Sequence, residues 1–86
     1  MANDFHEIAM IGDRDSVLLA KAAGLAVFAE TDGAAAARRI HRLAKGGVKV
    51  IFITEPLFAQ CGEAVEQYKR ESVPAIIPIP DSHGST

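Results

Sequence analysis

The residues best suited to chemistry lie in a short polar stretch after the first apolar segment. Asp13 and Asp15 stand two positions apart, and Ser16 follows them. Carboxylate oxygens are ligands for hard divalent cations, so the pair can be interpreted as a metal-assisted phospho-acceptor site. Aspartates at the start of a helix more commonly cap its free N–H groups and sit well in its dipole. We favour the capping role, because it requires no further residue.

Two kinds of phosphate chemistry fit this stretch poorly. Gly12–Ser16 matches neither the dinucleotide-binding glycine pattern nor the P-loop, and its two carboxylates would repel a phosphate. A receiver-like phospho-acceptor domain would need an aspartate after the third strand, where the chain has Thr54 and Glu55. It would also need a lysine on a fifth strand. A receiver-like signalling or small-ligand-binding domain is therefore kept only as the alternative.

Other candidate nucleophiles and metal ligands are isolated along the chain. Cys61 is the only cysteine, and it falls on the apolar stripe of a helix. This position predicts a small buried hydrophobe rather than a reactive thiol. His41 is predicted to lie on a solvated helix face, and the three histidines have no ligand spacing. We predict no catalytic, cofactor-binding or metal-binding residues, and hence no enzyme.

Length and composition describe one small α/β domain. The chain has 86 residues, of which 49% are hydrophobic and 23% charged, and its net charge is −2. We expect a single domain over residues 1–80 and a tail over 81–86. The weak net charge gives no general attraction to nucleic acid or to an anionic membrane. No apolar run is long enough to span a membrane and no signal peptide is visible, so we expect a cytoplasmic location.

The elements that position these residues alternate along the chain. Continuous apolar strands separated by helix-period segments indicate a parallel sheet covered on both faces. Right-handed crossovers then favour a flavodoxin-like three-layer α/β fold with strand order 2-1-3-4. A well-buried first helix should start within Gly12–Ser16, a second after Asp32, and a single third helix at Thr54–Pro56. The four predicted strands are His6–Ile11, Ala26–Phe28, Val48–Ile53 and Ala75–Ile79.

The closing strand carries prolines at alternate positions. Pro74, Pro78 and Pro80 all lack a backbone N–H, and alternate N–H groups of a strand point to the same side. Proline in a sheet is confined to edges of this kind. The sheet should therefore end at this strand, which argues against the fifth strand that a receiver domain needs.

Several of these segments, in this order, resemble one known family. They are Ile11–Val17 after the first strand, Gly24-Leu25 before the second, Val50–Pro56 and Pro74–Pro80. Together they resemble the F subunit of the V-type rotary ATPases. The resemblance implies a non-catalytic, flavodoxin-like subunit of the central rotor stalk without a nucleotide site or cofactor. It also implies binding to the coiled coil of the D subunit and to other stalk subunits, in the soluble sector peripheral to the membrane.

The resemblance also directs attention to two surfaces. The family continues past the closing strand into a C-terminal helix that packs along the D subunit, and this sequence has the turn at 81–86 without that helix. Coupling through that helix is therefore not expected of this sequence. We predict partner binding at the end of the fourth strand, with the basic face of the second helix as another candidate. That basic face is otherwise an ordinary solvated surface. The predicted partner-binding residues are Ile79, Pro80, Asp81, Ser82, Arg38 and Arg42.

Overall fold

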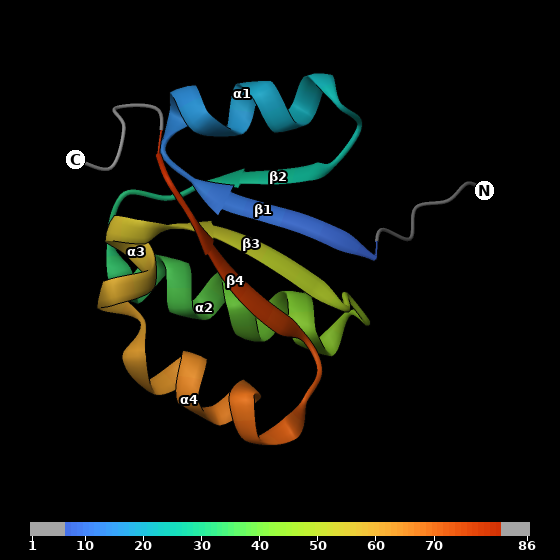
Figure 1. Ribbon diagram of the computed structural model, residues 1–86, viewed down its shortest axis with the longest axis vertical. Coiled ribbons are helices and arrows are strands. Elements are labelled where there is room, and N and C mark those ends of the chain that lie inside the picture. Colours follow the sequence, from blue (N-terminus) through green and yellow to red (C-terminus); the bar gives the residue numbers. More distant parts are fainter. Residues whose placement is uncertain (1–6, 82–86) are drawn as a thin grey trace.

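The computed structural model describes residues 7–81 and contains one four-stranded parallel sheet in the order β2-β1-β3-β4. Helix α1 lies on one side of the sheet, and α2, α3 and α4 lie on the other (Figure 1). The predicted three-layer, flavodoxin-like α/β fold and its strand order are confirmed. Along the chain the elements are β1 (Ile8–Gly12), α1 (Arg14–Ala22), β2 (Ala26–Ala29), α2 (Gly33–Lys45), β3 (Val50–Thr54), α3 (Glu55–Gln60), α4 (Gly62–Glu71) and β4 (Ala75–Ile79).

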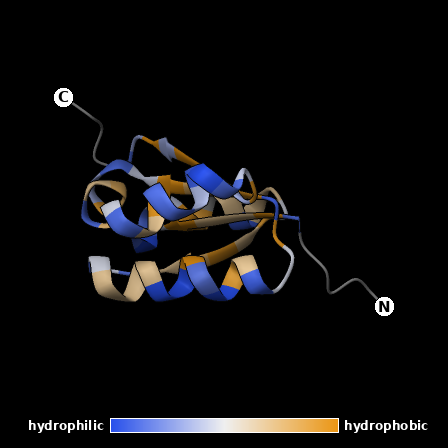
Figure 2. Ribbon diagram, turned by 90° about the horizontal axis from the view of Figure 1, so that it is seen from below, coloured by the Kyte–Doolittle hydropathy of each residue, from blue (hydrophilic) through white to orange (hydrophobic). Residues whose placement is uncertain are grey.

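The main core lies between the sheet and the layer of three helices. Successive strand residues point to opposite faces, and on the central strands β1 and β3 the residues facing α2, α3 and α4 are buried. Ile11, Ile51 and Ile53 have no exposed surface, and neither does Ile40 of α2. Figure 2, seen from the side of α2 and α4, shows hydrophobic strands behind helices that alternate hydrophobic and hydrophilic residues. This alternation is typical of amphipathic helices that pack one face on a core.

The strand ends differ slightly from the prediction. β1 ends one residue later than expected, and its predicted first residue, His6, lies outside the described residues. β3 begins two residues later and ends one residue later than expected, whereas β4 has the predicted bounds. For β3 the cause is local, because the N–H of Val48 bonds to the carbonyl of Leu43 at 3.1 Å. Val48 is therefore part of the turn that leaves α2, although its buried side chain resembles that of a strand residue.

The third predicted helix is in fact two helices, so the prediction of one continuous helix was wrong. Cys61 separates α3 from α4 with φ −108° and ψ 31°, outside the helical region. Gly62 follows as the first residue of α4. The kink lets the Cys61 side chain approach the start of α2, where Sγ lies 3.5 Å from the carbonyl oxygen of Gly33.

Helix α1 is less buried than its apolar composition suggested. Ser16 and Val17 are buried, but 57% of Leu18 is exposed. The reason is that α1 packs mainly on β2 and β1, with no second helix beside it on this face among residues 7–81. The expectation of a well-buried first helix was therefore wrong for its outer side.

Strand β4 forms one edge of the sheet, as the proline pattern predicted. The N–H of Ala75 donates to the carbonyl of Lys49 at 2.9 Å, which fixes the side on which the odd-numbered residues pair. The N–H positions of residues 76 and 78 then face outward, and Pro78 has no donor there. The outer edge is therefore poorly suited to pairing with a further strand.

Candidate functional site

The carboxyl ends of the strands surround a small hollow. Its volume is about 190 Å³, and Asp13, Thr54 and Asp81 line it together with Glu30. The rim of a parallel sheet is the usual place for a ligand. Asp15 is not among the residues that line the hollow, because it lies in the exposed first turn of α1.

Asp13 is the N-cap of α1. Its carboxylate accepts the backbone N–H of Ser16 at 3.2 Å and also the hydroxyl of Ser16. The capping role favoured from the sequence is confirmed. An aspartate committed to the first turn of a helix satisfies backbone donors that otherwise lack a partner.

The rim offers little for metal or nucleotide chemistry. Within residues 7–81 no group of three or more His, Cys, Asp or Glu side chains is placed to hold a metal ion. The hollow is also smaller than the roughly 300–1,000 Å³ typical of small-molecule sites. The geometry therefore favours structural roles for the polar residues at this rim.

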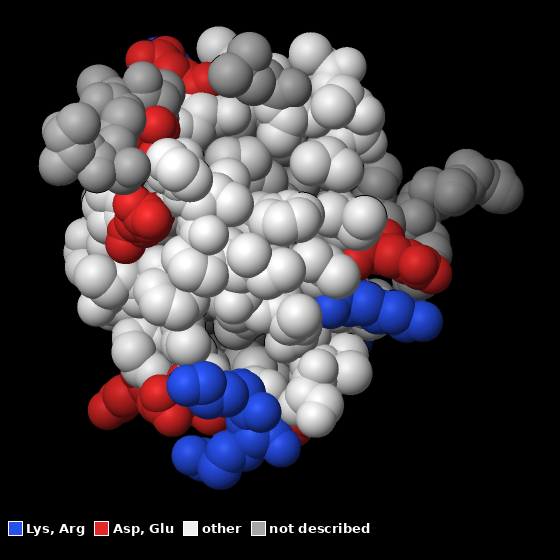
Figure 3. Space-filling view, viewed as in Figure 1, with Lys and Arg blue, Asp and Glu red and all other residues white. Residues whose placement is uncertain are grey.

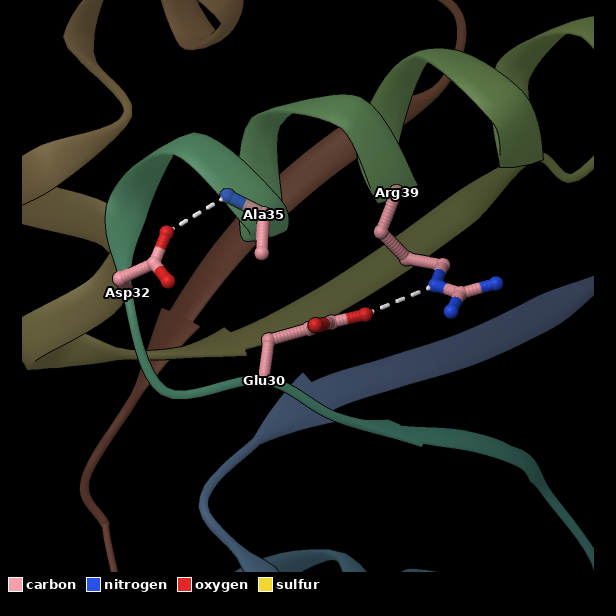
Figure 4. A network of polar contacts seen from close by, with 4 residues as sticks. All are labelled: Glu30, Asp32, Ala35 and Arg39. Atoms are coloured by element: carbon pink, nitrogen blue, oxygen red, sulfur yellow. Dashed lines mark hydrogen bonds and ion pairs between the residues drawn. The ribbon is translucent and has the colours of Figure 1, made fainter.

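The basic stretch of α2, residues 38–42, contains one arginine in an ion pair and two exposed arginines. Arg39 forms an ion pair with Glu30, with Nε 3.0 Å from Oε2, and its guanidinium lies 4.4 Å from the ring centre of Phe28. Figure 4 shows this pair beside the cap of α2, where Asp32 accepts the N–H of Ala35 at 2.8 Å. Arg39 thus joins α2 to the end of β2 rather than facing solvent freely.

Arg38 and Arg42 are exposed, as expected, and line a shallow surface with Glu30 and Arg39. This surface adjoins the β2 edge of the sheet, because Arg39 stacks on Phe28 of β2. Ile79, another predicted partner-binding residue, ends β4 at the opposite edge of the sheet. Glu30 lines both this basic surface and the rim hollow in which Asp81 lies, so the two predicted surfaces adjoin at Glu30.

The end of β4 is only partly exposed. Ile79 and Asp81 are half-buried, and Pro80 is exposed. Asp81 turns into the lining of the rim hollow. Ser82, with the rest of the predicted tail, lies outside the described residues.

His41 differs from its prediction as a solvated side chain. It is half-buried, and its Nδ1 lies 2.7 Å from the hydroxyl of Tyr68 on α4. The two ring centres are 5.4 Å apart. Burial, and secondarily the charge of Glu71, raises the pKa of Tyr68, so the hydroxyl stays protonated. The pair joins α2 to α4, which the spacing of residues along one helix does not reveal.

Cys61 is buried, as predicted, with 2% of its surface exposed. Burial raises the pKa of its thiol, which disfavours the reactive thiolate. The thiol is therefore a packing group at the junction of α2, α3 and α4.

The sequence missed an apolar groove between α4 and β4. Its volume is about 980 Å³, and Phe58, Val65 and Ile76 are among its lining residues. The charged side chains of Glu66 and Lys69 also line it. Ile76 is half-buried and packs against the core, and the part of it that lines the groove is revealed only by the position of α4.

Comparison with known proteins gives a consistent result. The family model described as ATP synthase (F/14-kDa) subunit matches residues 8–86. The chain is 42% identical over 80 residues to the V-type ATP synthase F subunit of Fusobacterium nucleatum, covering 93% of this chain and 76% of that protein. It is 40% identical over 81 residues to the V-type ATP synthase F subunit of Clostridium perfringens, covering 94% and 77%. The corresponding F subunit of Clostridium botulinum is 38% identical over 81 residues, covering 94% and 79%.

These matches agree with the fold. Within residues 7–81, no helix has both the length and the apolar character needed to cross a membrane. The match covers most of this chain and more than three quarters of each of these relatives. The chain belongs to the ATP synthase (F/14-kDa) subunit family, which includes the V-type ATP synthase F subunits.

Proposed function

We propose that this chain is a non-catalytic subunit of the central rotor stalk of a V-type ATPase or ATP synthase. It binds the coiled coil of the D subunit and contacts other stalk subunits. In this role it supports the coupling of ATP hydrolysis or synthesis to ion transport through protein contacts alone. It works on the cytoplasmic side, in the soluble sector attached to the membrane.

The observation that carries the proposal is the use of polar rim residues for structure. Asp13 caps α1 through Ser16, and Glu30 is paired with Arg39. The rim hollow of about 190 Å³ leaves little room for a nucleotide. Family membership then favours assembly with other ATPase subunits as the role of the domain.

Binding to the D subunit tests the proposal. The D subunit from the same organism is purified and mixed with this chain, and the mixture is analysed by size-exclusion chromatography with light scattering. We expect one stable complex with one copy of each protein. Separate elution of the two proteins at micromolar concentrations would contradict the proposal.

A second assay separates this role from a receiver-like one. The chain is incubated with Mg²⁺ and acetyl phosphate, and its mass is measured beside that of Asp13→Asn. We expect no phosphorylated product from either protein. A phosphorylated product that requires Asp13 would overturn the non-catalytic assignment.

A further inference from the structure

Helix α2 concentrates the positive charge of this chain. It carries four of the nine Lys and Arg residues and none of the eleven Asp and Glu residues. Five basic and eleven acidic residues remain elsewhere, so the rest of the chain has a net charge of −6, whereas the whole chain has −2. The weak overall charge is therefore the sum of a strongly basic helix and an acidic remainder.

The basic residues of α2 form one exposed stripe. Arg38, Arg42 and Lys45 are exposed, and positions i, i+4 and i+7 lie on the same side of a helix. The opposite side of α2 is held in the core, because Ala36 and Ile40 have no exposed surface. We call Arg38, Arg42 and Lys45 the α2 basic stripe.

Two charges of this stripe are not compensated by the described part of the chain. Within it, the side chains of Arg38 and Arg42 form no ion pair and no hydrogen bond. Glu30 is the nearby carboxylate, but it is engaged by Arg39 at 3.0 Å. Arg38 and Arg42 are therefore left to face solvent or a partner.

Basic side chains elsewhere on the surface are arranged differently. Figure 3 shows that the Lys and Arg side chains on the face viewed there lie beside Asp or Glu side chains. On α4, for example, Lys69 lies 3.8 Å from Glu66. The α2 basic stripe thus differs from the mixed-charge surface that this domain has on its viewed face.

The stripe does not serve the stability of α2 itself. Like charges at i and i+4 destabilise a helix, and Arg38 and Arg42 have this spacing. Cations are favourable near the last turn of a helix, which holds Arg42 and Lys45. Arg38 lies one turn earlier, so the helix dipole does not account for it. The position of Arg38 therefore indicates a role outside the folding of α2.

The space beside the stripe suits an acidic side chain. Arg38, Arg39 and Arg42 border a hollow of about 90 Å³ together with Glu30 and Ala35. This volume is well below the roughly 300–1,000 Å³ typical of small-molecule sites. Guanidinium groups bind carboxylates through paired hydrogen bonds. The hollow therefore fits a carboxylate that projects from a larger partner.

Nucleic acid and membranes fit this surface less well. The acidic remainder of the domain would repel a polyanion, and no aromatic side chain is exposed on α2 for a base to stack on. A helix that binds a membrane surface typically combines basic side chains with large apolar ones. The exposed residues of α2 are Ala34, Arg38, Arg42 and Lys45. A narrow acidic protein segment is the better complement.

We infer that the α2 basic stripe is the docking surface for an acidic α-helix of another protein, whose carboxylates meet Arg38 and Arg42. Side chains at i and i+4 of a helix stand about 6 Å apart, so two carboxylates with this spacing match two arginines one turn apart. The inference rests on the proposed function for the location of the partner, which is another subunit of the rotary complex. It adds the chemistry of the contact and places that contact on α2.

Carbodiimide crosslinking in the assembled complex tests the inference. The reagent joins an amine to a carboxylate in direct contact, and Arg38→Lys and Arg42→Lys each keep the positive charge and add an amine. We expect each variant to gain a crosslink to Asp or Glu residues three or four positions apart in one segment of another subunit. Native Lys21, exposed on α1 at the other face of the sheet, should give no crosslink to that segment. No crosslink from either variant, or a crosslink only to a second copy of this chain, would overturn the inference.

Rebinding measurements test the contribution of charge. The ATPase complex purified without this chain is titrated with the wild type and with the double variant Arg38→Glu/Arg42→Glu. We expect the double variant to bind about tenfold more weakly or worse, because repulsion replaces attraction at both contacts. The affinity of the wild type should fall as the salt concentration rises, and the double variant should lose most of this dependence.

A second double variant controls for the change in net charge. Arg14→Glu/Lys21→Glu changes the net charge by the same amount at exposed positions of α1, and its affinity should change less than about twofold. Thermal unfolding establishes that both double variants fold. Equal affinity of Arg38→Glu/Arg42→Glu and the wild type would overturn the inference alone. Failure of the wild type to rebind would overturn the proposed function, and the inference with it.

Discussion

The backbone N–H of Gly33 donates a 2.9 Å hydrogen bond to Oε1 of Gln60. This contact joins the first residue of α2 to the last residue of α3, which lie 27 positions apart. A β-carbon on Gly33 would lie 2.5 Å from the β-carbon of Gln60, closer than atoms can approach. The start of α2 therefore depends on a glycine at this position for packing.

Gly33→Ala should destabilise the domain by about 1–3 kcal/mol, because the added methyl group overpacks a closed contact. Gly62→Ala is the matched control, since a β-carbon on Gly62 meets nothing within 4 Å. That substitution should be neutral or stabilise by up to about 1 kcal/mol through the unfolded chain. Urea unfolding of both variants gives the two free energies. Equal stability of the two variants would contradict the role of close packing at Gly33.

Ile51→Ala should lower the free energy of unfolding by about 2–5 kcal/mol, because Ile51 is fully buried on the central strand β3. Val73→Ala, at a position 55% exposed, should stay within about 0.5 kcal/mol of the wild type. Thermal or urea unfolding measures both. A loss below about 0.5 kcal/mol at Ile51 would mean that β3 is not central to the core.

Pro78→Val should increase self-association, because it restores an outward backbone donor on the edge strand β4. Glu66→Val is the control for added hydrophobicity, since it also adds an exposed valine but no backbone donor. Analytical ultracentrifugation from micromolar to millimolar concentration measures the association of each. Monomeric Pro78→Val over this range would argue against the role of proline at the edge.

The stability of the domain should decline in alkaline solution, partly because of Cys61. Burial raises the pKa of the folded thiol, whereas the unfolded thiol ionises near its ordinary value of about 8.5. The Cys61 contribution is therefore complete below that pH and is lost as the pH rises through it toward the folded pKa. Urea midpoints measured from about pH 7 to about pH 10 should fall less steeply for Cys61→Ala than for the wild type.

Tyr68 should also contribute to the loss of stability in alkaline solution, at higher pH than Cys61. Its pKa is raised by burial and secondarily by the charge of Glu71. Tyr68→Phe should therefore remove part of the decline near about pH 10. Identical pH slopes for the wild type, Cys61→Ala and Tyr68→Phe would contradict the roles given to both side chains.

The parts of the fold that were predictable depend on local pattern. Apolar strands alternating with helices predicted the parallel sheet and its order, and Pro78 predicted its edge. The cap at Asp13 was also readable, because capping involves residues three positions apart. Asp32, which accepts the N–H of Ala35, is a second cap with the same short-range spacing.

The missed features depend on contacts between elements. The break at Cys61 serves a contact with Gly33, and the burial of His41 depends on Tyr68 of another helix. The partial exposure of Phe52 likewise follows from how far α1 extends across the sheet, which no single strand reveals. Sequence patterns specify which side of an element is apolar but not what covers it.

Binding to the D subunit is the most direct test of the central claim. Isothermal titration of this chain into the purified D subunit from the same organism measures stoichiometry and affinity together. The proposed role predicts saturable binding with equal numbers of the two proteins and a dissociation constant of about 1 μM or lower. No heat of binding together with separate elution on a sizing column would contradict the assignment to the rotor stalk.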